Sequence, residues 1–142
     1  MRARIQAALV AVSALVTLGS AGCKDYTYFD VHVKFDPATF SGQVGRVQAC
    51  HLFVTGAESN DYGIADNTRN CPPPNAGLDM GIFEYSALAD SGQLTFTMKV
   101  YKSTMESEAC LFGEGSVSAT LPAPMTTNML DLTVVQMGMG CQ

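Results

Sequence analysis

The sequence predicts an all-β protein, an antiparallel β-sandwich of immunoglobulin-like or related Greek-key type with six to seven short strands. Three observations predict this class. Runs of alternating apolar and polar residues recur along the chain, clusters of Gly, Pro, Asn and Asp separate them, and no window shows sustained helical periodicity. Strands of this kind each bury one face in a shared core, so two layers packed face to face are expected.

The first 22 residues are predicted to be an export signal that is removed from the mature protein. Arg2 and Arg4 precede an apolar stretch at residues 7–18, which is shorter than the roughly 20 apolar residues that span a bilayer. A permanent membrane helix is the alternative. It would place several Ser, Thr and Gly residues in or near lipid without helix partners, so the export signal is favoured.

The end of this stretch, Ser20-Ala21-Gly22-Cys23, resembles the lipobox of bacterial lipoproteins. The resemblance implies that a lipid is attached to the Cys23 thiol, that the signal is cut just before this residue, and that the new amino group is acylated. Ser20 departs from the class, which prefers Leu there. Lys24 stands where Asp would retain such a protein at the inner membrane, so an outer-membrane location is implied. The alternative is an ordinary cleavage after Ala21 or Gly22, which would release a soluble secreted protein.

Residues 23–142 are expected to form one domain with a single core. Removal of the signal takes away two positive charges, so the formal net charge falls from −5 to −7. A surface of this sign repels phosphate backbones, which argues against nucleic-acid binding. No second apolar run is long enough to span a bilayer, so membrane attachment is expected through the lipid on Cys23.

Strands are expected at residues 26–36, 44–55, 80–88, 93–102, 109–112, 115–121 and 129–137. Alternation also predicts which side chains of three strands face the core: Phe29, Val31, Val33 and Phe35 in the first, Leu94, Phe96, Met98 and Val100 in the fourth, and Leu130, Leu132 and Val134 in the last. Residues 103–110 are expected to form one helical turn or a loop.

The segment at residues 56–79 has no strand pattern, and this makes it the first candidate for a binding surface, because long loops in compact domains are usually functional or disordered. Its candidate binding residues are Glu58, Asp61, Tyr62, Asp66 and Asp79. The acidic members could wrap a Ca²⁺ ion, although their spacing matches no EF-hand loop.

The cysteine count supports the lipid anchor. The chain has five: Cys23, Cys50, Cys71, Cys110 and Cys141. In an oxidising compartment an odd cysteine needs an explanation, and a lipid on the first one leaves four that can form two disulfides.

The expected disulfides are Cys110–Cys141 and Cys50–Cys71. In an antiparallel hairpin, a register that pairs residue 121 with residue 130 places Cys110 opposite Cys141. Cys50 is then left to close the long loop through Cys71, and each closure is worth about 3 kcal/mol in the chain-entropy model. The rival pairing joins Cys50 to Cys110 across the sandwich, as in immunoglobulin domains, but the chain has no Trp to pack against such a bridge.

A copper site is a further alternative. Met137, Met139 and Cys141 alternate near the end of the chain, with Met125 and Met129 upstream, and soft sulfur ligands select Cu(I). The same alternation is typical of a core strand, and a thiolate ligand would need an unpaired Cys141.

Catalysis is not expected. The chain has two histidines, His32 and His51, neither in a metal-ligand spacing, and it has no G-x-S-x-G motif or glycine-rich phosphate loop. His32 is interpreted as a surface residue and His51 as a structural one.

The sequence therefore predicts a non-enzymatic lipoprotein of the outer membrane that faces the periplasm or the exterior. Its domain would be structural or would bind another envelope protein, and no cofactor is expected. A small-ligand or metal module, binding Ca²⁺ or Cu(I), is the alternative from another class.

Overall fold

The computed structural model describes residues 26–63, 77–123, 127–138 and 141. Seven strands account for most of them, which confirms the all-β prediction. They are β1 (Thr27–Phe35), β2 (Ala49–Gly56), β3 (Asn60–Gly63), β4 (Asp79–Ala87), β5 (Gly92–Tyr101), β6 (Leu111–Leu121) and β7 (Asn128–Gln136).

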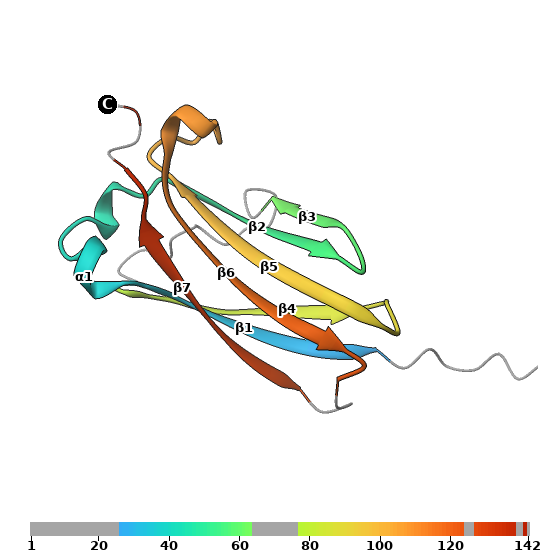
Figure 1. Ribbon diagram of the computed structural model, residues 1–142. Coiled ribbons are helices and arrows are strands. Elements are labelled where there is room, and N and C mark those ends of the chain that lie inside the picture. Colours follow the sequence, from blue (N-terminus) through green and yellow to red (C-terminus); the bar gives the residue numbers. More distant parts are fainter. Residues whose placement is uncertain (1–25, 64–76, 124–126, 139–140, 142) are drawn as a thin grey trace, which may run out of the picture.

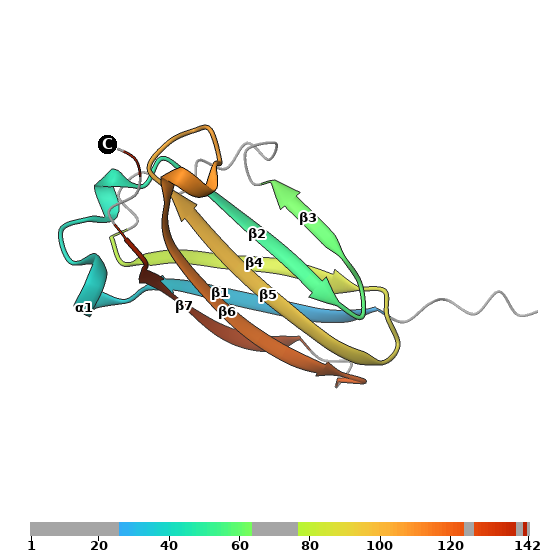
Figure 2. The same cartoon turned by 45° about the horizontal axis from the view of Figure 1, so that its top comes forward.

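The strands form two layers, β4-β1-β7 and β3-β2-β5-β6, which cross each other in Figures 1 and 2. The layers are joined where Gly113 and Glu114 of β6 pair with Gln136 and Val135 of β7. Every strand pair is antiparallel except β1 and β7, which run parallel from Phe29↔Asn128 onward. The prediction of purely antiparallel pairing is wrong for this pair, because the chain enters both strands from the same end of the molecule.

The order of the strands differs from that of an immunoglobulin constant domain. There the first, second, fifth and fourth strands share one sheet. Here the first strand lies between the fourth and the last, and the second and fifth strands pair in the other layer. The protein is therefore an all-β fold whose strand order is not that of an immunoglobulin constant domain.

The core lies between the two layers, and the predicted inward residues fill it. All eight predicted inward side chains of β1 and β5 are at most 1% exposed, as are Leu132 and Val134 of β7. Leu130, the third predicted inward residue of β7, is only partly buried against this core. The ring of Phe96 in β5 lies 5.5 Å from that of Phe29 in β1 and 5.4 Å from that of Tyr85 in β4. This one side chain therefore joins three strands of both layers.

Glycines allow β7 to cross the inner face of β6. A Cβ atom at Gly113 would lie 2.8 Å from the carbonyl oxygen of Val135, and one at Gly115 would overlap the carbonyl oxygen of Thr133. The sequence predicts two separate strands here, 109–112 and 115–121. The structure instead has one continuous β6, and the glycines make room for the backbone of β7.

Short helical turns replace parts of the predicted strands and loops. Pro37–Phe40 form one turn, α1, capped by Asp36, whose carboxylate accepts from the Ala38 N–H at 3.2 Å. The ring of Phe40 is buried between those of Phe35 at 4.6 Å and Phe112 at 5.3 Å. A 3-10 turn at Val44–Arg46 replaces the beginning of the strand predicted at 44–55. A second one, Glu108–Cys110, ends the segment predicted as a turn or loop.

Cys110 and Cys141 form the disulfide that the sequence favours, with Cα atoms 4.4 Å apart. The register behind that prediction is wrong by two residues, because Gly113 pairs with Gln136 where the predicted register requires Gly138. The bridge still forms because both cysteines lie outside the paired strands. Cys50 is buried and is itself disulfide-bonded, so the rival Cys50–Cys110 pairing is wrong. Its predicted partner, Cys71, lies outside the described residues, as does Cys23.

Candidate functional site

The two described parts of the predicted binding segment 56–79, residues 56–63 and 77–79, do not form one surface. Asp79 begins β4 and pairs with Lys34 at the end of β1. Glu58 lies at the other end of β4, where its carboxylate accepts hydrogen bonds from the backbone N–H groups of Leu88 at 2.8 Å and Ala89 at 3.3 Å. A strand of nine residues is roughly 30 Å long, so these two carboxylates cannot share an ion.

The other three predicted residues, Asp61, Tyr62 and Asp66, do not complete such a site in the described structure. Asp61 and Tyr62 belong to β3, a strand that the sequence does not predict, and pair with Phe53 and Leu52 of β2. Their side chains lie outside the described residues, and so does Asp66. A Ca²⁺ site that includes both Glu58 and Asp79 is therefore contradicted by the fold.

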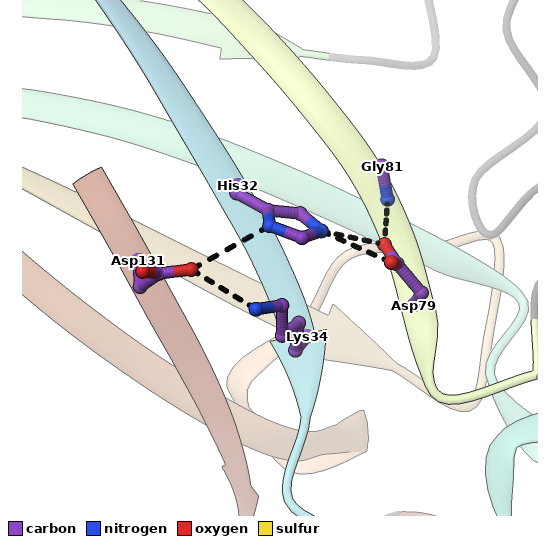
Figure 3. A network of polar contacts seen from close by, with 5 residues as sticks. All are labelled: His32, Lys34, Asp79, Gly81 and Asp131. Carbon is purple, nitrogen blue, oxygen red and sulfur yellow. Dashed lines mark hydrogen bonds and ion pairs between the residues drawn. The ribbon is translucent and has the colours of Figure 1, made fainter. Parts of the chain in front are cut away.

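A polar cluster on the outer face of the β4-β1-β7 layer brings together residues far apart in the sequence (Figure 3). His32 of β1 donates through Nε2 to both carboxylate oxygens of Asp79 at 3.0 Å, and its Nδ1 lies 3.5 Å from Oδ1 of Asp131 in β7. Lys34 donates to the same Asp131 oxygen at 3.1 Å, and the Gly81 N–H donates to Asp79 at 2.8 Å. The cluster clamps the three strands together at one end of the layer.

The electrostatics of this cluster stabilise the contacts among the three strands. The hydrogen bond from His32 is the main cause that lowers the pKa of Asp79, and the bond from Gly81 adds to it. The two carboxylates face different nitrogens on opposite sides of the imidazole, so one ion cannot bind both of them and the ring. Alternation predicts that His32 points outward, but its two partners depend on which strands become neighbours, which the sequence does not reveal.

β4 is the longer of the two edge strands that the structure describes. It pairs with β1 on one side, and no described strand lies on its other side. The opposite edge strand, β3, has four residues, whereas β4 has nine. Proteins usually protect long edges with Lys, Pro, bulges or cover. β4 has no Lys or Pro, and its one irregularity, beside Gly81, lies at its beginning.

The outer face beside this edge carries apolar and acidic side chains. Ile82 of β4 is 44% exposed and Met129 of β7 is 60% exposed. Between them Asp30 and Glu84 lie directly opposite each other on β1 and β4. Like charges in such a pair are destabilising, and no described residue forms an ion pair with either. This face therefore suits a partner that brings positive charge and apolar side chains.

The outer face of the other layer is occupied by internal contacts. The hydroxyl pairs Thr95–Ser118 and Thr97–Ser116 are each 2.9 Å apart. The carboxylate of Glu108 lies 2.7 Å from Nζ of Lys99 and raises the pKa of that amine.

His51 lies on this same face and has contacts that fit its structural interpretation. Its ring stacks on that of Phe53 at 4.3 Å, and its Nδ1 bonds to the Glu106 carboxylate.

Two further findings concern metals and membranes. Among the described residues, no group of three or more His, Cys, Asp or Glu side chains could hold a metal ion. Cys141 is in a disulfide, so the thiolate that the copper alternative requires is absent. Within the described ranges, no helix has the length and apolar character needed to cross a membrane.

Comparison with known proteins gives one likeness of fold. No family model matches the sequence, and no curated protein matches it either. The structure is similar to the crystal structure of a fimbrial assembly protein from Parabacteroides distasonis, with a TM-score of 0.50 and 8% sequence identity. The similarity covers 78% of this chain and 53% of the other, so the chain spans about half the length of that protein. At this identity the two proteins share a fold.

Proposed function

We propose that the protein is a cell-envelope lipoprotein, anchored through a lipid on Cys23, whose domain binds another protein of the envelope through the β4 edge. The outer edge of β4, beside which no described strand lies, is the observation that carries the proposal. The protein acts as a structural or binding component of the outer membrane, facing the periplasm or the exterior, and catalyses no reaction.

The chemistry of the β4 edge favours a protein partner. A row of unpaired backbone N–H and C=O groups binds an extended segment as an additional strand, and side chains on alternate positions then set specificity. Glu84 and Asp30 would be neutralised by a Lys or Arg on the added strand, and Ile82 would pack against an apolar neighbour. The partner is therefore an extended protein segment with basic and apolar residues at alternate positions.

A second copy of this chain fits the edge less well. Antiparallel self-pairing of β4 would bring its acidic residues, Asp79 and Glu84, close to those of the copy, since β4 has no basic residue. The net charge of −7 on each mature chain would add to this repulsion.

Two observations outside the edge support the proposal. The lipobox-like residues Ser20 to Cys23 favour export and anchoring, and Lys24 favours the outer membrane. The fold is similar to that of a fimbrial assembly protein, which favours a structural or protein-binding role in an envelope assembly.

The anchor is tested by native, non-reducing mass spectrometry of the protein purified in detergent from its own host. The expected chain begins at Cys23, carries added acyl mass and is four hydrogens light because of two disulfides. A chain without acyl mass would contradict the anchor, and the protein would then be a secreted one.

The edge is tested by photo-cross-linking in cells. A photoreactive residue at Ile82 or Ser86, both exposed on β4, is expected to give a discrete protein adduct. The matched control is Ser118, an exposed strand residue on the other layer, which should give none. The variant Ile82→Lys introduces an edge charge that blocks strand addition, so it should remove the adduct formed at Ser86. Adducts of equal yield from all three positions would contradict a specific edge contact.

A further inference from the structure

We infer that the end of the domain at which β1 begins lies against the lipid headgroups, with Tyr26, Tyr28 and Leu88 as the side chains that contact them. The inference rests on the proposed anchor at Cys23 and adds the orientation of the domain on the membrane. It identifies a lipid-contacting surface that meets the β4 edge only at the last residues of β4.

Exposed apolar side chains gather at this end of the fold. Tyr26 is 42% exposed, and Tyr28 and Leu88 are both 47% exposed. The tyrosine rings lie 6.4 Å apart. Thr27 at the start of β1 pairs with Ala87 at the end of β4, so Leu88 follows next to Tyr26. Tyr is enriched at membrane interfaces, because its ring is apolar and its hydroxyl stays in the headgroup region.

The length of chain before β1 forces this end close to the membrane. Only two residues, Lys24 and Asp25, separate Cys23 from Tyr26, and the three Cα-to-Cα steps span at most about 11 Å when fully extended. The headgroup region of one leaflet is roughly 5–8 Å thick. A lipid on Cys23 therefore holds Tyr26 at or just above the headgroups in every conformation of this short tether.

The charge distribution excludes electrostatic attraction as the main cause of this contact. The described lysines and arginines all lie towards the other end of the domain: Lys34, Arg46, Lys99 and Lys102. The described charges beside Leu88 are both negative: the carboxylate of Glu58, which accepts from the N–H groups of Leu88 and Ala89, and that of the exposed Asp90. Lys24, next to the anchor, adds one positive charge, which is worth about 1 kcal/mol at an anionic surface. Contact through tyrosine and leucine should therefore depend little on salt or on anionic lipid.

This orientation leaves most of the β4 edge accessible, since only its last residues lie beside Tyr28 and Leu88. β4 runs from α1 at one end of the molecule to the beginning of β1 at the other (Figures 1 and 2). With the beginning of β1 at the headgroups, β4 extends away from the membrane, and α1 with the segment 102–110 lies farthest from it.

The test uses the absence of Trp from the chain, so that a single Trp reports one position. Full-length lipidated Tyr28→Trp protein is reconstituted into phosphatidylcholine vesicles whose acyl chains are brominated near the headgroup. Strong quenching of the indole is expected, with no change at high salt. The matched control is Met105→Trp, which is 76% exposed in the segment at the far end and should not be quenched.

A second variant separates contact from simple tethering. Met129→Trp places an indole on β7, the strand beside β1. Replacing Tyr26 and Tyr28 by Ser in this variant should reduce the quenching of the indole, because the beginning of β1 would then no longer be held at the headgroups and the domain would move freely on its tether. Unchanged quenching, or an unquenched Tyr28→Trp indole in vesicle-bound protein, would overturn the inference. Flotation of the vesicles reports the anchor independently: protein that does not float with them contradicts the proposed function and this orientation together.

Discussion

Gly115 is the residue on which the junction of the two layers depends most directly. A Cβ atom at this position would overlap the carbonyl oxygen of Thr133, and backbone atoms of a paired strand cannot move aside cheaply. We expect Gly115→Ala to lower the free energy of unfolding by about 1–3 kcal/mol, as overpacking does. Urea denaturation measures this loss. The control is Gly45→Ala, where a Cβ atom meets nothing within 4 Å, and equal losses from both variants would contradict the account.

Asp79 makes the stability of the protein dependent on pH. The bonds from His32 and Gly81 lower its pKa below the ordinary value of 3.8. Because the carboxyl group is more acidic in the folded chain, its contribution is complete above about pH 4 and is lost as the pH falls through the folded-state pKa. Asp79→Asn should therefore be less stable than the wild type at neutral pH, and the difference should shrink in acid.

Urea denaturation of both proteins at neutral pH and near pH 2 measures this effect. Asp90→Asn is the control, since Asp90 is exposed and accepts no hydrogen bond from the described residues. A difference between Asp79→Asn and the wild type that persists unchanged in acid would show that the carboxylate stabilises the fold in some other way.

Residue-level predictions from the sequence succeed where they depend on local alternation. The inward faces of β1 and β5 follow from period-two patterns, and all eight side chains are buried. The cluster of His32, Asp79 and Asp131 could not be predicted in the same way. Its members are up to 99 residues apart in the sequence, and they meet only because β1 lies between β4 and β7.

At the scale of elements, the disulfide holds the connection between β5 and β6 to the end of the chain. The bridge Cys110–Cys141 closes a loop of 31 residues, which corresponds to roughly 4 kcal/mol in the chain-entropy model. We expect Cys110→Ser combined with Cys141→Ser to lower the free energy of unfolding by about 2–4 kcal/mol.

The double variant is preferable to a reducing agent, because Cys50 is also disulfide-bonded and would be reduced too. The segment itself should stay in place, since Lys99 contacts Glu108 at 2.7 Å and His51 contacts Glu106. Non-reducing urea denaturation measures the loss, and an unchanged midpoint would show that the bridge does not restrict the unfolded chain.

Element boundaries were predictable only where alternation and turn residues agree. The stretch 44–48 is predicted as strand because its two β-branched valines precede the apolar run of β2, but residues 44–46 form a 3-10 helix before that strand begins. β3 has no alternating pattern, and it forms because it completes the antiparallel pair with β2. The parallel pairing of β1 with β7 joins the two ends of the domain, and periodicity shows which face of a strand is buried but not which strand lies beside it.

At the scale of the whole molecule, the two layers should unfold together, because one core joins them. Phe96 is completely buried and contacts Phe29 and Tyr85 of the opposite layer. Its truncation to Ala should cost about 3–5 kcal/mol. If the layers form one cooperative unit, the amides of β1 and β4 should lose protection as much as those of β2 and β5.

Native-state hydrogen exchange measures both layers at once in the Phe96→Ala variant. Phe53→Ala is the matched control, since Phe53 lies on the same layer but on its partly exposed outer face, and it should cost less. Loss of protection confined to β2, β5 and β6 would show that the layers are separate folding units held together at the β6–β7 junction. Equal loss of amide protection in both layers would mean that the domain unfolds as one unit. A partner bound at β4 would then stabilise both layers by the same free energy.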